Sequence, residues 1–588
     1  MTLLEERPET GAHERDEVRL TVRDLRVGFE SRDGVREVVK GVSFDLHAGR
    51  CVAIVGESGS GKSVTARTLV GLTGNGSVVS AERLALGDLD LTDQSPKSWR
   101  RIRGKRIGFI LQDALVSLDP LRPVGREIDE ALRLHGWGDR ASRARKVVDL
   151  LASTDVPQPE LRARQRPGQL SGGLRQRALI ASAIALSPEI VIADEPTTAL
   201  DVTVQAQVLA LLNDMKSRGA SLILISHDLA VVANLADEIL VMSGGEVVEQ
   251  GPAERILHRP EHPYTRSLIN AVPGGHTRGE RLAPQQEAVP DFHLTPAKGR
   301  AVPDAAAPVL QASHLVKRFT APDGSSTLAV NDVSFELFRG ETLGIVGESG
   351  SGKSTTARIA LALESAEGGA VELLGEPWSR AREGRRRRLR TRISVVYQDP
   401  LSSFDPRWTT QRILRDAIPD DLGLSSAAEN RRVRELLAQV ALPESVLGRS
   451  PLYLSGGQRQ RIAIARALAP SPDIIVLDEA VSALDVSIQA QILDLLVDLQ
   501  GEYGLSYLFI SHDLGVIHHM SDRVLVMKDG RVVEQGDAEQ VFLRPAHPYT
   551  RQLVGALPTI DDRAPSTWDD TTTETNDLTT TDTTGDRP

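Results

Sequence analysis

Cysteine is nearly absent from this sequence of 588 residues, which contains only Cys51. One cysteine excludes a disulfide framework and makes a cysteine-ligated metal cluster untenable. Because Cys51 begins the apolar run CVAIV, we expect it to pack inside a strand as a small hydrophobic residue.

Long apolar runs are missing as well. The sequence has no run of 18 or more apolar residues, so we expect no membrane-spanning helix. The N-terminal stretch MTLLEERPETGAHERDE is too charged for a signal peptide. We therefore expect a protein that stays in the cytosol unless a partner holds it at a membrane.

The chain also lacks a strong excess of one charge outside its C-terminus. The formal net charge is −11, but residues 559–588 contribute −6 of it. The remainder gives no strong field with which to argue for or against nucleic acid. The run at residues 385–388, four arginines, has a counterpart in KSWRRIRGKRIGF of the first half, and a solvated helix face is the favoured interpretation.

One octapeptide, in contrast, occurs twice. GESGSGKS spans residues 56–63 and 347–354, after the apolar runs CVAIV and TLGIV and before helix-compatible stretches. This order predicts a strand, a phosphate-binding loop and a helix. Glycines allow successive backbone N–H groups to converge on a triphosphate, and the helix N-terminus favours the same anion. Each half is therefore predicted to bind a nucleoside triphosphate.

Further motifs return at a nearly constant offset. LSGGLRQR at 170–177 recurs as LSGGQRQR at 454–461, IVIADEPTTALD at 190–201 as IIVLDEAVSALD at 474–485, and ISHDL and HPYTR each recur 285 residues on. The halves are one duplicated domain. Short apolar segments predict buried strands, residues 120–165 have helix-like periodicity, and SGGEVVEQG and KDGRVVEQG each suggest a hairpin.

An Asp-Glu pair ends one apolar segment in each half. Asp194 and Glu195 follow IVIA, and Asp478 and Glu479 follow IIVL. At a strand end, the first carboxylate would hold the Mg²⁺ shell, and the second would polarise a water for attack on the γ-phosphate. A solvated turn is the alternative, but the placement after an apolar strand favours catalysis.

This order of motifs resembles the nucleotide-binding domains of ABC transporters along nearly the whole chain. The segments LSGGL and LSGGQ resemble that superfamily's signature, which no other phosphate-loop family shares. The resemblance implies an α/β fold with tandem P-loop NTPase domains, each with a mixed-sheet core and a helical subdomain. By the same resemblance, Gln112 and Gln398 match the Q-loop, residues 199–201 and 483–485 the D-loop, and His227 and His512 the switch histidine.

The resemblance implies a set of site residues in each half. The predicted catalytic residues are Glu195, His227, Glu479 and His512. The predicted nucleotide-binding residues are Phe29, Gly56, Glu57, Ser58, Gly59, Ser60, Gly61, Lys62, Ser63, Val64, Gln112, Ser171, Gly172, Gly173, Phe319, Gly347, Glu348, Ser349, Gly350, Ser351, Gly352, Lys353, Ser354, Thr355, Gln398, Ser455, Gly456, Gly457 and Gln458. The predicted Mg²⁺ ligands are Ser63, Gln112, Asp194, Ser354, Gln398 and Asp478.

The family mechanism implies two ATP sites shared between the halves. Residues 56–63 would face the signature at 455–458, and residues 347–354 the signature at 171–174. Each ATP would favour the closed state through contacts that are absent from the open state. The departure is Leu174, which stands where the second half has Gln458, and it introduces a modest asymmetry between the sites.

The segments HRPEHPYTRSLINAVP and LRPAHPYTRQLVGALP resemble the C-terminal segment of the oligopeptide/dipeptide/nickel importer ATPases. This implies an ATPase, bound at the cytoplasmic face of the membrane, that drives two integral-membrane permease subunits. An extracytoplasmic solute-binding protein would deliver the solute to these subunits. No nucleic acid and no direct membrane insertion are expected. The alternatives are a ribosome-associated translation factor of the ABC type and a nucleotide-binding scaffold without turnover. A translation factor of this type would have a long charged arm between its domains, which this chain lacks. The intact carboxylates argue against a scaffold without turnover.

The expected domain organisation follows from these motifs and from composition. We predict a disordered N-terminus at 1–17, a first nucleotide-binding domain at 18–272, a Pro/Ala-rich linker at 273–308, a second domain at 309–558 and a disordered acidic Thr/Asp tail at 559–588, each domain ending in its HPYT segment.

Overall fold

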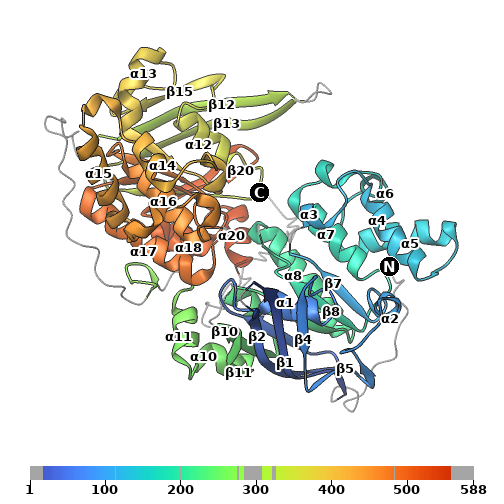
Figure 1. The fold of residues 1–588 in the computed structure, drawn as a ribbon. Coiled ribbons are helices and arrows are strands. Elements are labelled where there is room, and N and C mark those ends of the chain that lie inside the picture. Colours follow the sequence, from blue (N-terminus) through green and yellow to red (C-terminus); the bar gives the residue numbers. More distant parts are fainter. Residues whose placement is uncertain are drawn as a thin grey trace, which may run out of the picture.

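The computed structural model describes residues 17–32, 34–112, 114–198, 200–274, 277–283, 307–320, 326–482 and 484–557. The predictions of disorder at the N-terminus and in the tail, and most of the predicted linker, concern residues outside these ranges. Within them, two halves repeat the same order of elements, blue to green for the first and yellow to red for the second (Figure 1).

A six-stranded sheet forms the centre of each half. Its order is β11-β10-β3-β9-β8-β7 in the first half and β21-β20-β14-β19-β18-β17 in the second. All neighbours are parallel except the outer hairpins β10–β11 and β20–β21. The apolar segments and both hairpins predicted from the sequence are therefore confirmed. The strands of the first central sheet are β3 (Cys51–Val55), β7 (Ile107–Ile110), β8 (Ile190–Asp194), β9 (Ser221–Ile225), β10 (Glu238–Ser243) and β11 (Glu246–Pro252), and those of the second are β14 (Thr342–Val346), β17 (Ile393–Val396), β18 (Ile474–Asp478), β19 (Ser506–Ile510), β20 (Arg523–Lys528) and β21 (Arg531–Asp537).

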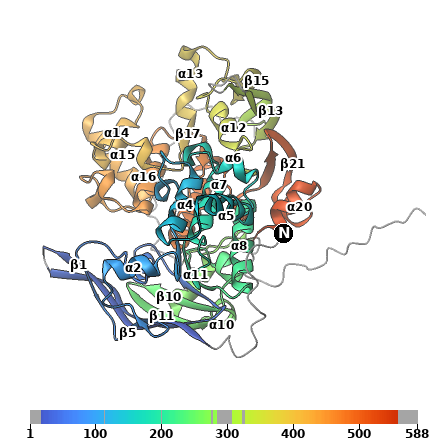
Figure 2. The same cartoon turned by 90° about the vertical axis from the view of Figure 1, so that its right-hand side faces the viewer.

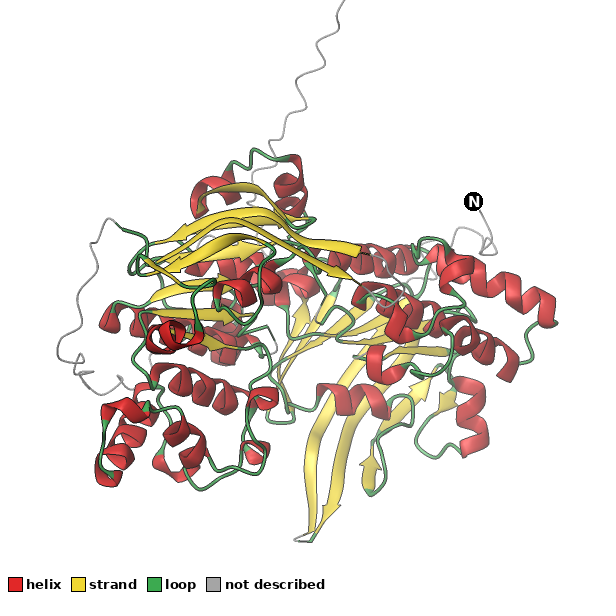
Figure 3. Cartoon of the chain, turned by 90° about the horizontal axis from the view of Figure 1, so that it is seen from above, coloured by secondary structure: helices red, strands yellow, loops and turns green. Residues whose placement is uncertain are grey.

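An antiparallel sheet packs on one side of each central sheet (Figure 3). Alternating apolar residues of its long strands, such as Leu20 and Val22, are fully buried with residues of β3 and β10 in one cluster. The first such sheet contains β1 (Val18–Ser31), β2 (Gly34–His47), β4 (Ser77–Ser80), β5 (Arg83–Leu86) and β6 (Leu89–Asp90), and the second contains β12 (Leu310–Thr320), β13 (Ser326–Leu337), β15 (Gly368–Leu373) and β16 (Glu376–Pro377).

Helices cover the remaining faces and build the helical subdomain expected around residues 120–165. Val124, Ile128 and Leu132 recur at four-residue spacing on one face of α4 and are buried, as an amphipathic helix requires. In the first half the helices are α1 (Lys62–Thr68), α2 (Pro96–Ile102), α3 (Ala114–Ser117), α4 (Val124–Leu134), α5 (Arg140–Ser153), α6 (Pro159–Arg162), η2 (Pro167–Gln169), α7 (Gly172–Ala183), α8 (Val202–Ser217), α9 (Leu229–Ala233), α10 (Ala253–His258) and α11 (Pro263–Asn270).

The second half repeats these helices with small insertions. They are α12 (Lys353–Ala360), α13 (Glu383–Leu389), η4 (Arg390–Arg392), η5 (Leu401–Ser403), α14 (Thr410–Asp416), η6 (Asp420–Leu422), α15 (Ser426–Gln439), η7 (Glu444–Val446), η8 (Pro451–Tyr453), α16 (Gly456–Leu468), α17 (Val486–Tyr503), α18 (Leu514–Met520), α19 (Ala538–Leu543) and α20 (Pro548–Gly555). The four-arginine run lies on α13, where Arg385, Arg387 and Arg388 are exposed and Arg385 pairs with Glu376. The solvated helix face is thus confirmed.

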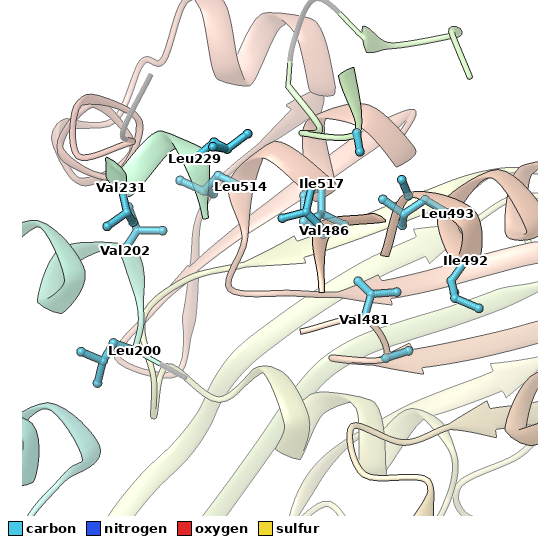
Figure 4. Packing of buried hydrophobic residues seen from close by; sticks show 14 of the residues in the cluster. Leu200, Val202, Leu229, Val231, Val481, Val486, Ile492, Leu493, Leu514 and Ile517 are labelled. Atoms are coloured by element: carbon cyan, nitrogen blue, oxygen red, sulfur yellow. The ribbon is translucent and has the colours of Figure 1, made fainter. Parts of the chain in front are cut away.

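The two halves lie against each other along a seam (Figure 2). One buried apolar cluster contains residues of both, including Leu229 from α9 and Leu514 from α18, which Figure 4 labels. Burial of apolar surface from both sides stabilises this arrangement.

A short segment after α11, residues 277–283, adds a second connection, and we call it the strap. It falls within the range predicted as a linker, yet it binds the second half. The Leu282 and Ala283 N–H groups donate to the Asp494 carboxylate at 3.1 and 3.0 Å, and Arg281 forms two hydrogen bonds with Asp498 at 2.9 and 3.0 Å. Leu282 is 2% exposed, so the strap contributes to the core as well as to the surface.

Candidate functional site

Each phosphate loop connects the central strand of its sheet to a helix. The loop leaves β3 at Gly56, whose φ of +147° disfavours any residue with a β-carbon. A β-carbon there would also collide with the Met242 carbonyl oxygen of β10. Gly347 repeats this geometry against Met527. The octapeptides therefore form the strand, loop and helix that the sequence predicts.

The loop lysines are folded back onto their own loops. The Lys62 ammonium donates to the carbonyl oxygens of Gly56 at 2.6 Å and Glu57 at 2.8 Å, and Lys353 does the same at 2.7 and 2.8 Å. Both side chains are about 5% exposed, and burial lowers their pKa values. Each ammonium thus lies inside the concave loop, where it would place a full positive charge beside a bound anion.

The first carboxylate of each Asp-Glu pair lies beside the loop serine. Ser63 Oγ donates to Asp194 Oδ1 at 2.9 Å, and Ser354 Oγ donates to Asp478 Oδ1 at 3.2 Å. The other oxygen of Asp194 is buried without a hydrogen-bond partner among the described residues. Burial raises the pKa of Asp194 and of Asp478. An unpaired buried carboxylate oxygen beside a hydroxyl suits Mg²⁺, which prefers oxygen ligands.

The second carboxylate of each pair contacts the predicted switch histidine. The distance from His227 Nδ1 to Glu195 Oε1 is 3.3 Å, and that from His512 Nδ1 to Glu479 Oε2 is 3.5 Å. Both glutamates have left-handed backbones, with φ of +50° and +51°. This conformation is costly for a residue other than glycine and is frequent at active sites.

The contact between glutamate and histidine shifts the pKa values of both groups in the same directions in the two halves. Burial disfavours the charged form of His227, but its hydrogen bond and charge interaction with Glu195 outweigh burial and raise its pKa. The pKa of Glu195 is lowered by the same contact, against the effect of burial. The pair in the second half behaves alike. Glu195 and Glu479 are therefore ionised at neutral pH.

The two glutamates differ in their other partners. Glu195 Oε2 accepts hydrogen bonds from Gln112 Nε2 at 2.7 Å and Thr198 Oγ1 at 3.0 Å. In the second half the equivalent hydroxyl, Ser482 Oγ, donates instead to the Glu479 backbone carbonyl. From the sequence we predicted asymmetry only at Leu174. This second difference lies at Thr198, where the second half has Ser482.

The signature turns begin helices at the seam. Ser171 and Ser455 are exposed N-cap residues of α7 and α16. Only the second turn has a capping box, in which Gln458 Oε1 accepts the Ser455 N–H at 3.1 Å, because Leu174 has no acceptor. Gly457, the second glycine of this turn, allows α16 to pack closely on α17, since a β-carbon at Gly457 would lie 2.6 Å from Ile488.

Hydrogen bonds cross the seam at the start of α8 and α17. The Ser58 N–H donates to Asp485 Oδ1 at 3.0 Å, and the Ser349 N–H donates to Asp201 Oδ2 at 3.2 Å. Each phosphate loop therefore faces the opposite half at the start of α17 or α8. Among the described residues these bonds reach the D-loop aspartates and not the signature serines themselves.

The remaining predicted residues lie at the edges of this region. Gln398 is exposed after β17, and Val64 and Thr355 lie in the first turn of α1 and α12. Of the D-loops, Ala199 and Ala483 are outside the described residues. Phe29 packs partly buried at the end of β1, whereas Phe319 is 44% exposed with the Lys317 ammonium 5.2 Å from its ring centroid.

A cavity of 160 Å³ lies between the halves, with His227 and His512 on its wall. Both N-cap aspartates of the helices that follow, Asp228 and Asp513, also line it. The two switch histidines therefore line a common cavity at the seam.

One contact in each half was not predicted from the sequence. Tyr264 and Tyr549, the tyrosines of the HPYT segments, contact the phosphate loops through their hydroxyl groups. The recurrence of HPYTR was the available signal, but it did not indicate what the tyrosine contacts.

Within the described residues no helix has the length and apolarity to span a membrane.

Comparison with known proteins identifies the family. Residues 39–198 and 330–482 match the ABC transporter family, and residues 248–299 and 533–585 match the oligopeptide/dipeptide transporter C-terminal region. Glutathione import ATP-binding protein GsiA of Escherichia coli (strain K12) is 42% identical over 564 residues, covering 92% of this chain and 90% of GsiA. The protein of the same name from Shigella dysenteriae serotype 1 (strain Sd197) has the same identity and coverage.

Among solved structures, the dimeric structure of a bacterial ABC transporter cassette is 29% identical and covers 39% of this chain and 98% of its own, with a TM-score of 0.36. The alternative of a ribosome-associated translation factor finds no support in these comparisons. With more than half of its residues in two matches to the same family, the chain belongs to the ABC transporter ATPases and carries two of their ATP-binding domains in one polypeptide.

Proposed function

We propose that this ATPase drives the import of short peptides, or of a related small solute, through a separate membrane permease. The names of the relatives support import and a peptide-like cargo, because glutathione is itself a tripeptide. Both C-terminal segments match the oligopeptide/dipeptide transporter region, which supports the same cargo class. The partners would be two integral-membrane permease subunits and an extracytoplasmic solute-binding protein, with this chain bound at the cytoplasmic face.

One observation carries the coupling of hydrolysis to movement. Each phosphate loop donates a backbone N–H to an aspartate of the opposite half, so the loop that binds ATP is also part of the seam. ATP bound there favours the closed seam if it contacts both halves, and loss of the γ-phosphate removes that preference. Opening and closing of the seam would be transmitted to the permease.

The chain's own residues take distinct parts in hydrolysis. Lys62 and Lys353 would exchange their loop carbonyls for β- and γ-phosphate oxygens. Glu195 and Glu479, ionised and held by their histidines, would accept the proton of the attacking water. Left-handed backbone at both glutamates holds the carboxylates at the strand end, facing the loop.

Magnesium fits the residues beside each loop. Ser63 with Asp194, and Ser354 with Asp478, would hold it, and Gln112 and Gln398 would complete the protein's share of the ligands. Bound Mg²⁺ supplies positive charge that offsets the negative charge of the phosphates.

The catalytic assignment is tested with Glu195→Gln combined with Glu479→Gln. We expect ATP to bind with a Kd within about threefold of the wild type, because glutamine keeps the size and polarity of the side chain. Hydrolysis should fall at least about 100-fold, since the proton acceptor is lost. ATPase activity that survives in this variant would refute the assignment. Gln250→Glu, an exposed site on β11, serves as a charge-changing control.

The transport assignment is tested by purification in mild detergent. The tagged full chain should retain two membrane permease subunits, and ATPase activity in vesicles should rise when a solute-binding protein loaded with peptide is supplied. Retention of ribosomes in place of permease subunits would contradict the proposal.

A further inference from the structure

The HPYT tyrosine of each half accepts a hydrogen bond from the backbone of its phosphate loop. The Glu57 N–H donates to the Tyr264 hydroxyl oxygen at 3.1 Å, and the Glu348 N–H donates to Tyr549 at the same distance. The contact joins residues 207 positions apart in the first half and 201 in the second. Because the contact recurs in both halves with the same geometry, an accidental contact of one side chain does not explain it.

The tyrosine is held in place by the segment that carries it. His262 is the N-cap of α11, and its Nδ1 accepts the Tyr264 N–H at 3.2 Å. Glu249 on β11 accepts the N–H groups of Glu261 and His262 at 2.9 and 3.1 Å. The second half repeats both devices with His547 and Glu534. The start of each HPYT helix is therefore fixed to the edge hairpin, and the phenol is aimed at the loop.

The phenol is suited to sit beside a triphosphate. Burial raises the pKa of Tyr264 to about 12 and that of Tyr549 to about 12, so both hydroxyls are neutral at physiological pH. A neutral oxygen accepts the N–H without placing a negative charge beside the phosphates, as a carboxylate would. In the second half the Lys528 ammonium also lies 4.4 Å from the Tyr549 ring centroid.

The same loop residue reaches across the seam with its side chain. Glu57 Oε1 accepts a hydrogen bond from Ser487 Oγ of α17 at 2.7 Å, and Glu348 Oε1 accepts one from Thr203 Oγ1 of α8 at 2.8 Å. Glu57 is thus bound by its backbone to the C-terminal segment of its own half and by its carboxylate to the opposite half. The chain of contacts runs from tyrosine to glutamate to hydroxyl, once in each half.

We propose that Tyr264 and Tyr549 are positioning residues that fix the phosphate loop for ATP and, through Glu57 and Glu348, couple the C-terminal segment to the seam. The proposal rests on the proposed function, because it assigns a role within the same ATP sites. An unrestrained loop must lose conformational freedom when it closes on ATP, and the tyrosine removes part of that cost beforehand.

A double-mutant cycle tests this in the full chain. One variant carries Tyr264→Phe with Tyr549→Phe, a second carries Ser487→Ala with Thr203→Ala, and a third carries all four changes. We expect each pair to raise the KM for ATP by about 3- to 10-fold, the loss of one hydrogen bond per site, with kcat changed less than about twofold. Because both pairs act through the same glutamate, the combined shift should be clearly smaller than the product of the two.

Tyr507→Phe is the matched control. Its hydroxyl is buried and donates one hydrogen bond to a backbone carbonyl, that of Leu496 at 2.8 Å, without touching a phosphate loop. Tyr507→Phe should lower Tm by about as much as each of the Tyr264→Phe and Tyr549→Phe changes does, and it should leave the KM for ATP unchanged. A KM shift equal to that of the control, or shifts that multiply in the four-residue variant, would overturn the proposal.

Binding of a non-hydrolysable ATP analogue to the same variants separates the two proposals. If the wild type failed to hydrolyse ATP, the proposed function would fall, while the Kd values for the analogue would still decide whether the tyrosines position the loop. Weaker binding in the tyrosine pair with non-multiplying shifts supports the positioning role, and Kd values within twofold of the wild type contradict it.

Discussion

At the scale of single residues, the protonation of His227 and His512 determines how Glu195 and Glu479, the proposed catalytic glutamates, are held. The pKa of His227 is raised above its usual 6.5 by Glu195, despite opposing burial. The stabilisation from this pair is therefore complete below about pH 6.5 and is lost as the pH rises through the raised pKa of the histidine. Nucleotide-free enzyme should hold its glutamate through an ion pair at the acid end and through a neutral hydrogen bond at the alkaline end.

We expect Glu195→Gln to lower the pKa of His227, because burial then acts without the compensating carboxylate. NMR titration of histidine-labelled protein, with His227→Gln to assign the signal, measures this. A control is His512, whose pKa should not move in the same variant, since its partner is Glu479. An unchanged His227 titration would contradict the contact.

Lys62→Ala should weaken ATP binding at one of the two sites. Lys62 lies inside the first loop, and among the described residues its ammonium donates hydrogen bonds only to carbonyl groups of that loop. Titration with a fluorescent ATP analogue should resolve one site near wild-type affinity and one weakened by at least about tenfold. Lys353→Ala should give the mirror result, and equal loss at both sites in either variant would show that the pockets do not load independently.

At the scale of elements, the two signature helices begin differently. The capping box at α16 binds the Ser455 N–H through Gln458, and α7 lacks it because residue 174 is leucine. Helix N-termini with a satisfied first turn open less often than those without. The signature turn of the first half is accordingly the less restrained of the two.

Gln458→Leu should make the α16 signature resemble that of α7. The loss of one capping hydrogen bond, about 0.5–1 kcal/mol, corresponds to roughly 2- to 5-fold faster backbone hydrogen exchange at residues 455–458. Hydrogen-exchange mass spectrometry measures it. The reverse change, Leu174→Gln, should slow exchange at residues 171–174, and no change in either peptide would refute the role of the cap.

The elements themselves were largely predictable from sequence. Apolar runs of four to six residues, such as Ile190–Asp194, cannot be amphipathic helices of useful length, and all became buried strands. The glycine pattern of the loops and the four-residue periodicity of α4 were equally local signals. These features depend on residues close together in the sequence, which is why pattern alone was sufficient.

The contacts between elements were not predictable in the same way. Nothing near Tyr264 in the sequence indicates that its hydroxyl meets a loop 207 residues earlier. The strap was predicted only as linker, because Pro, Ala and Gly around it obscure its one buried apolar side chain, Leu282. The acceptor for the Leu282 and Ala283 N–H groups lies on α17. Such contacts follow from the tertiary packing of both halves, which a single sequence does not display.

At the scale of the whole molecule, the strap binds the first half's C-terminal end to the second half. Asp494, with its side chain 7% exposed, accepts two backbone N–H groups, whereas the Arg281–Asp498 pair is half exposed. Hydrogen bonds to a buried charge are stronger than exposed ion pairs. Asp494 is therefore the principal polar anchor of the strap.

We expect Asp494→Ala to accelerate hydrogen exchange in residues 277–283 by at least about tenfold, because it leaves two N–H groups without their acceptor. Asp498→Ala, on the next turn of the same helix, is the matched control and should change exchange by less than about threefold. Equal effects of the two variants would show that Asp494 is not the principal polar anchor of the strap.

Because the strap and α11 both lie on α17, the edge of the seam nearest the first phosphate loop is pinned. If these contacts persist when the halves separate, the halves would rotate about that edge instead of translating apart. The two chemically similar pockets would then open unequally. The first loop, beside the axis of rotation, would move a short distance, and the second loop, farther from it, a longer one. We then expect nucleotide to exchange with the surroundings sooner at the second pocket than at the first, because the strap and α11 contact α17 on one edge of the seam.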